Sequence, residues 1–153
     1  MKLNKVLFVG TGGGNDIFST LLAALSLRHH MSWKECAIAG VLSPFHFHTV
    51  VEGPVPYAFR VLPETERFVP RNDGTIKIGF IDAVVAKLIK EKRSLNVTDV
   101  FGLSLGAGSR GLESAFRELS KVYDQIVLVD VGGDIFYRGH MDKRVLSPMF
   151  DAI

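Results

Sequence analysis

The stretch VGTGGGNDIFS, residues 9–19, places four glycines in five positions between an apolar run and an asparagine–aspartate pair. Glycine is unfavourable inside a helix or a strand, so this cluster indicates a tight turn or a close approach of the backbone to a ligand. We expect a strand before the glycines and a helix after them, whose free N–H groups and positive dipole end face an anion. Asn15 or Asp16 would cap that helix.

Working outward, short apolar runs rich in β-branched residues alternate with segments of helical period. The predicted strands are residues 5–10, 36–42, 97–104 and 125–131, and the predicted helices are residues 16–30, 79–93 and 110–122. This alternation predicts a three-layer α/β sandwich with a parallel, Rossmann-like sheet of about four strands. Residues 43–78, which are rich in proline, are predicted to be a small β insertion that forms a hairpin or a lid.

Length and composition favour one α/β domain over residues 1–153, because 47% of the residues are hydrophobic and 22% are charged. The formal charge of +2 predicts neither a nucleic-acid nor an anionic-membrane partner. No apolar run is long enough for a membrane span, and a single cysteine, Cys36, without an export signal favours the cytoplasm. The segment after the fourth strand contains no clear helix, which predicts a homo-oligomer or a missing C-terminal half.

Three of the four predicted strand exits are rich in glycine, namely GTGGGND, SLGAGSRGL and DVGGD. Because the carboxyl ends of parallel strands meet at one edge of a sheet, we expect these exits to form one ligand crevice. The predicted ligand-binding residues are Gly12, Gly13, Gly14, Asn15, Asp16, Gly106, Gly108, Arg110, Gly132 and Gly133. Arg110 would clamp a phosphate or a carboxylate. The alternative, that these glycines serve only as tight turns, stays open.

Asp130 and Asp134 flank a valine and two glycines at the end of the fourth predicted strand. Magnesium prefers such oxygen ligands, so both are predicted to hold Mg²⁺ and to act as catalytic residues. Asp16 would repel a phosphate unless a metal ion or a substrate cation lies between them. An alternative metal site for zinc or iron would use His46, His48 and His140.

The sequence lacks residues that the known nucleotide- and cofactor-binding motifs require. No Lys-Ser or Lys-Thr pair follows the glycines, so the P-loop is absent. Asn15 stands where the third glycine of a dinucleotide fingerprint belongs, and Leu42-Ser43 offers no acid for a ribose, so NAD is not supported. Phe8 occupies the position of the acidic residue in a methyltransferase loop, so S-adenosylmethionine is not supported either. Ser104 lacks a nucleophile elbow.

The motifs GTGGGND, VLVDVGGDIFYRG and LSPMFDA resemble those of an uncharacterised family of conserved hypothetical proteins from archaea and some bacteria. The resemblance spans nearly the whole chain, and family members are about twice as long. It implies signature positions at 12–16, 130–134 and 147–151, but no catalytic residue and no activity. His140 and Asp142 depart from the acidic pair that the family pattern leads us to expect.

The sequence therefore predicts a protein that binds a phosphorylated or nucleotide-like metabolite at the carboxyl edge of a parallel sheet. A magnesium-dependent enzyme is one form of this prediction. The alternatives are a non-catalytic nucleotide-binding or regulatory module and a structural subunit of an oligomer. Turnover of a ligand separates the first from the second, and the absence of any ligand would favour the third.

Overall fold

The computed structural model of the chain describes residues 3–12, 16–42, 50–63, 66–71, 74–79 and 81–130. Within these ranges the chain is an α/β protein with a mixed sheet of six strands, a separate two-stranded hairpin and three α-helices. The strands are β1 Leu3–Gly10, β2 Trp33–Leu42, β3 Val50–Val55, β4 Ala58–Val61, β5 Glu66–Arg71, β6 Gly74–Gly79, β7 Val100–Ser104 and β8 Gln125–Val129. The helices are α1 Asp16–Leu27, α2 Ile81–Glu91 and α3 Gly108–Val122.

The four strands predicted from apolar runs are neighbours in the large sheet, whose order is β3-β4-β7-β2-β1-β8. Strands β7, β2, β1 and β8 pair in parallel. For the inner strands burial explains why the sequence predicts them, since a parallel strand covered on both faces reads as a continuous apolar run. Strand β8 lies at the edge of the sheet and has no fully buried residue, and Leu128 is 61% exposed. All five residues of β7 are buried, as are the last five of β1.

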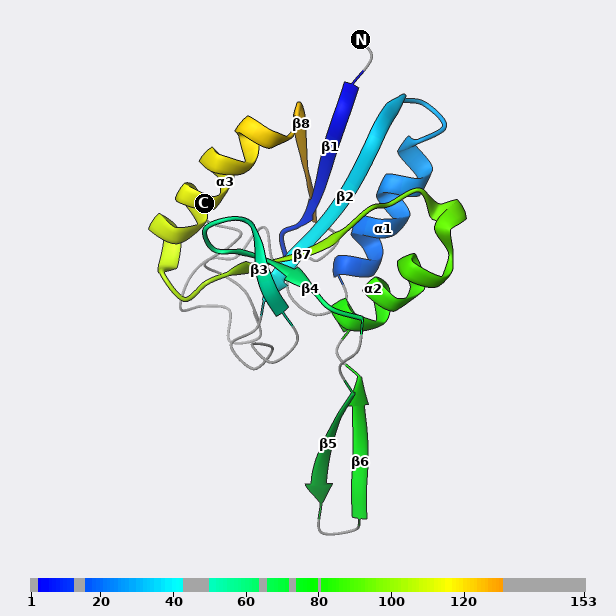
Figure 1. Cartoon of the computed structure of the whole chain (residues 1–153), viewed down its shortest axis with the longest axis vertical. Helices are drawn as coiled ribbons and strands as arrows, with labels where there is room; N and C mark the ends of the chain where they lie inside the picture. The colour runs from blue at the N-terminus through cyan, green and yellow to red at the C-terminus, as the bar shows by residue number, and fades with distance from the viewer. Residues whose placement is uncertain are drawn as a thin grey trace, which may run out of the picture.

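The prediction of a wholly parallel sheet is wrong, because residues from the proline-rich segment enlarge it. Strand β4 pairs antiparallel with β7, and β3 pairs antiparallel with β4, which makes the sheet mixed. The two-residue connection at Tyr57, which has a φ of 64°, closes the β3–β4 hairpin. Strands β5 and β6 form a second hairpin, which Figure 1 shows extending away from the six-stranded sheet.

Most predicted boundaries differ from the observed ones by two or three residues at one end or both. Two of these differences have a clear local cause. The first helix ends at Leu27, because residues 28–30 form a turn in which the N–H groups of His30 and Met31 both donate to the carbonyl of Leu27 (2.9 and 2.8 Å). Strand β7 begins at Val100 instead of residue 97, because Asn96 adopts a left-handed conformation with φ 58° at the end of the 3₁₀ turn Arg93–Leu95.

Helices cover the two faces of the sheet unequally. Alternate residues of β1 separate the two cores: Val6 and Phe8 pack in the core that α1 and α2 cover, and Leu7 and Val9 pack in the core under α3. Figure 1 shows α1 and α2 on the opposite side of the sheet from α3. Each fully buried leucine or phenylalanine contributes about 1.5–3 kcal/mol to folding.

Cys36 lies in β2 and is buried, as its place in an apolar run predicts. Burial raises the pKa of its thiol to about 12, so the thiol stays protonated and unreactive near neutral pH. None of the helices in the described parts of the chain has the length and apolar character that a membrane crossing needs.

Candidate functional site

The strand order places a change of direction between β1 and β8. From β1 the chain adds β2 and then β7 on one side, and after α3 it returns to add β8 on the other side of β1. In open α/β sheets, ligands bind beyond the carboxyl ends of the strands at such a reversal. The residues that follow β1 and β8 therefore form the candidate site, which consists of Thr11, Gly12, Asp16 and Asp130.

Thr11 links the carboxyl ends of β1 and β8 through two hydrogen bonds. Its N–H donates to the carbonyl of Val129 at 3.0 Å, and its hydroxyl donates to the same oxygen at 3.3 Å. Thr11 is 9% exposed, so these bonds are shielded from water. Since Asp130 follows Val129 directly, the end of β8 is fixed beside the first residue of the glycine loop.

Gly10 allows α1 to begin close to the end of β1. A Cβ atom at Gly10 would lie 2.7 Å from the hydroxyl oxygen of Thr20 and 3.2 Å from the carbonyl oxygen of Asp16. The Thr20 hydroxyl donates to that carbonyl at 2.7 Å, so it has little freedom to move. The first turn of α1 therefore packs against the strand end at a distance that only glycine permits.

Gly12 leaves room for a carboxylate. A Cβ atom at this position would collide with Oδ2 of Asp16, which is a buried atom. Asp16 is the first residue of α1, where the helix dipole favours a negative charge. The Asp16 carboxylate lies against Gly12, and Asp130 follows the residue bonded to Thr11. The Asp16 carboxylate and the backbone that leads into Asp130 thus both lie beside the segment Thr11–Gly12.

Asp82 is a further acid at this edge, and sequence reasoning missed it. Its Oδ1 lies 3.1 Å from where a Cβ on Gly40 would stand, and Ile17 contacts the same position at 3.3 Å. Asp82 is 7% exposed, and this desolvation raises the pKa of its carboxyl group to about 6. The sequence contains a signal that could have identified Asp82. Residues 82, 85, 86 and 89 form a buried stripe on α2, so the helical spacing of the apolar residues also predicts that Asp82 is buried.

The third predicted exit follows β7 and lies two strands from β1, about 10 Å away at the usual strand spacing. The N–H of Gly106 donates to the hydroxyl of Ser104 at 3.1 Å, and the N–H of Gly108 donates to the carbonyl of Leu105 at 2.9 Å. Gly108 has φ 58°, which favours glycine at the start of α3. Both N–H groups therefore donate to acceptors within the turn itself. Arg110, in the first turn of α3, is exposed.

Several predicted site residues lie outside the described residues. These are Gly13, Gly14, Asn15, Gly132, Gly133 and Asp134, together with His46, His48 and His140 of the alternative metal site. Among the residues that the structure describes, no group of three or more His, Cys, Asp or Glu side chains is arranged to hold a metal ion. A magnesium site would therefore need Asp134 or ligand oxygens in addition to Asp16 and Asp130.

The fold and this edge define an α/β protein in which glycine follows strand β1 and an aspartate follows its parallel neighbour β8. A family described as "Protein of unknown function (DUF1152)" matches residues 7–153, so the chain belongs to that family. This match confirms the expected membership of an uncharacterised family. Neither the curated proteins nor the solved structures contain a match to this chain.

Proposed function

We propose that the protein binds a phosphorylated or nucleotide-like metabolite at the carboxyl ends of β1 and β8, as a Rossmann-like, three-layer fold would. The strand order β7-β2-β1-β8 carries this proposal, because it puts the chain reversal between β1 and β8, where the GTGGGND and VDVGGD segments leave the sheet. The first turn of α1 supports it, because its N–H groups and positive dipole end lie at the same edge.

Because acidic side chains lie at this edge, the proposed complex includes a cation. A phosphate beside Asp16 and Asp130 would be repelled unless a positive charge lay between them. Magnesium suits carboxylate and phosphate oxygens together, and it keeps several waters when protein ligands are few. In the proposed complex Asp16 and Asp130 hold the ion with Asp134, the glycine N–H groups of residues 12–14 bind phosphate, and Arg110 adds a positive charge from α3. When bound, Mg²⁺ would offset phosphate charge and polarise the reacting oxygen.

The Asp82 carboxyl group gives a specific reason to consider catalysis at this edge. A carboxyl group with a pKa near 6 exchanges its proton near neutral pH, which is the property that general acid–base catalysis requires. The form of the proposal that includes a reaction is therefore a magnesium-dependent enzyme. The non-catalytic form is a cytoplasmic binding module, acting alone or as a subunit of a homo-oligomer.

A thermal-shift screen tests the proposal. Nucleotides, sugar phosphates and their dephosphorylated counterparts are compared with and without MgCl₂, because a ligand that binds only the native state raises its melting temperature. We expect a magnesium-dependent rise with one phosphorylated class and none with its dephosphorylated counterpart. Chromatography of that ligand after incubation then separates turnover from binding. Equal shifts for phosphorylated and dephosphorylated compounds, or no shift for any, would overturn the proposal.

A further inference from the structure

Strand β8 ends the six-stranded sheet on one side, and among the described strands it pairs with β1 alone. The carbonyl of Val129 accepts from the N–H of Thr11, so the backbone polar groups of Val129 face β1. Successive residues of a strand direct these groups to opposite sides, so those of Ile126 and Leu128 face away from β1. The outer edge of β8 therefore presents backbone donors and acceptors with which another strand can pair.

This edge is also apolar. Strand β8 has the sequence QIVLV, which contains neither a charge nor a proline, and its register with β1 is continuous. Ile126 packs against the core under α3, and Leu128, two residues further on, lies on the same face of the strand. Leu128 is nevertheless 61% exposed. The apolar face of β8 thus continues into solvent at the edge of the sheet.

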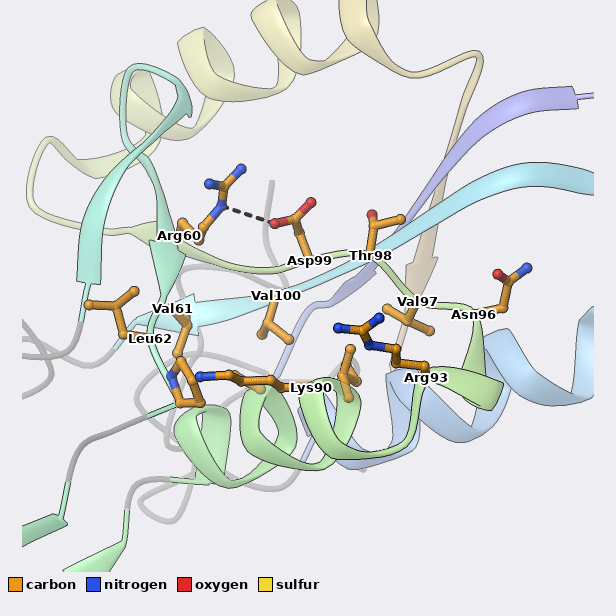
Figure 2. Close-up of a pocket in the computed structure, with 13 residues that line it drawn as sticks. Arg60, Val61, Leu62, Lys90, Arg93, Asn96, Val97, Thr98, Asp99 and Val100 are labelled. Atoms are coloured by element: carbon orange, nitrogen blue, oxygen red, sulfur yellow. Dashed lines mark ion pairs between the residues drawn. The ribbon is translucent and has the colours of Figure 1, made fainter.

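The opposite edge of the sheet differs. Strand β3 has the sequence VVEGPV, which includes Glu52 and Pro54, and its register with β4 is irregular. Charges, prolines and bulges are the features by which proteins prevent edge strands from pairing with other chains. In the neighbouring strand β4, Arg60 forms an ion pair with Asp99 at 2.9 Å, which Figure 2 shows. The β3 edge therefore carries protective features that β8 lacks.

We propose that β8 forms the interface of a homodimer, in which it pairs antiparallel with β8 of a second copy of this chain. The sequence of β8 favours a second copy, because Ile126 and Leu128 lie symmetrically about Val127. A two-fold axis at Val127 sets Leu128 opposite Ile126 of the second copy. These two residues also carry the outward backbone groups, so one register satisfies the free edge and covers the exposed leucine.

The acidic residues that flank β8 limit this contact to residues 125–129. The same axis sets Asp124 opposite Asp130 of the second copy, where like charges repel. The carboxylate of Asp124 accepts from the N–H groups of Asn4 and Lys5 at 2.6 and 3.0 Å, so it is directed toward β1 and away from the open edge. The proposed dimer rests on this strand edge alone and does not depend on a ligand at the candidate site.

Amide hydrogen exchange tests the pairing, because it reports on the outward N–H groups themselves. Exchange is followed by NMR in the ¹⁵N-labelled protein at about 50 µM and about 1 mM. We expect the N–H groups of Ile126 and Leu128 to exchange about threefold more slowly at the higher concentration, as the monomeric fraction falls. The N–H of Val127, which faces β1, is the internal control and should not depend on concentration. Protection of Ile126 and Leu128 that is equal at both concentrations would overturn the proposal, because another segment of the same chain would then cover the edge.

The matched variants are Leu128→Lys and Val84→Lys. Both residues are exposed and apolar, at 61% and 46%, but Val84 belongs to α2, which contacts β4 and β7. Sedimentation equilibrium of the unaltered protein should show a dimer with a dissociation constant below about 100 µM. Leu128→Lys should weaken the dimer at least about tenfold, and Val84→Lys should leave it unchanged. A monomer at every concentration, an unaltered dimer in Leu128→Lys, or an equal effect of both variants would overturn the proposal. If Leu128→Lys does not fold, the exchange rates of the unaltered protein decide.

Discussion

The two ends of the parallel strands differ in charge. At the carboxyl ends lie Asp16, Asp82 and Asp130, and at the other end of α2 lie the cations Lys90 and Arg93. Helix dipoles favour this distribution, because α1 and α2 begin at the carboxyl edge and end at the opposite one. Acidic side chains thus gather at the carboxyl edge, whereas the amino edge carries acids and bases together, such as Asp124 and Glu35 beside Lys5.

Asp82 and Asp124 show how burial can outweigh the other effects on the pKa of a carboxyl group. Asp82 is buried, and desolvation raises the pKa of its carboxyl group to about 6 although a helix N-terminus lowers the energy of its charge. A dipole contributes about 0.3–1 kcal/mol, less than one pKa unit, so desolvation is the larger effect. Asp124 lies at the amino end of β8 and is exposed. There the N–H groups of Lys5 and Asn4 lower the pKa of the Asp124 carboxyl group.

The largest expected effect is that of Asp82→Asn on the pH dependence of stability. Because the folded-state pKa of Asp82 is raised from 3.8 to about 6, the protein should lose stability as the pH rises from about 4 through 6. The loss is roughly 3 kcal/mol at most, and stability should then stay level as far as this group is concerned. Asn cannot ionise, so the variant should lack the loss. Urea unfolding between pH 4 and 8 measures it, and an unchanged pH profile in the variant would contradict the burial argument.

The next effect is that of Asp130→Asn on ligand binding. If Asp130 holds magnesium, the variant should bind the phosphorylated ligand at least about tenfold more weakly when MgCl₂ is present, with little change when it is absent. Asp124→Asn is the control, because Asp124 lies at the opposite end of the same two strands. Calorimetric titration measures both variants. An equal loss in the two would show that charge alone, and no metal site, is responsible.

A smaller effect is expected from Gly12→Ala. The new methyl group would occupy the place of Asp16 Oδ2, so the carboxylate must rotate away. Because the obstacle is the end of a side chain, stability should change by less than about 1 kcal/mol. Magnesium-dependent affinity should fall by about threefold to tenfold. Combining Gly12→Ala with Asp16→Asn tests the cause: the two losses should not add, and additive losses would show that Gly12 acts independently of Asp16.

The smallest effect is expected from Asp124→Asn on acid stability. The lowered pKa of Asp124 means that its contribution is present above the ordinary value of 3.8 and is lost as the pH falls below it. The variant should therefore be less sensitive to acid than the unaltered protein, the opposite of the trend that Asp82 produces. Acid unfolding followed by circular dichroism measures this difference. A steeper acid transition in the variant would contradict the assigned hydrogen bonds.

Local patterns predicted the elements well. The apolar run at KVLFVG is a strand because parallel strands buried on both faces contain few polar positions. The run QIVLV is also a strand, although it lies at the edge of the sheet and none of its residues is fully buried. The helical spacing of Leu112, Ala115 and Leu119 predicted the buried face of α3. The glycines also predicted close packing of the backbone. At Gly10 and Gly12 atoms of α1 approach so closely that a side chain would not fit.

The sequence by itself thus determined the α/β alternation, the buried strands and the positions at which glycine and aspartate follow them. Only the tertiary structure decided that β8 lies beside β1, that β4 pairs antiparallel with β7, and that Asp82 lies over Gly40. The physical reason is that periodicity reports on neighbours along one element, whereas strand order depends on contacts between residues far apart in the chain. The candidate site between β1 and β8 exists through such distant contacts.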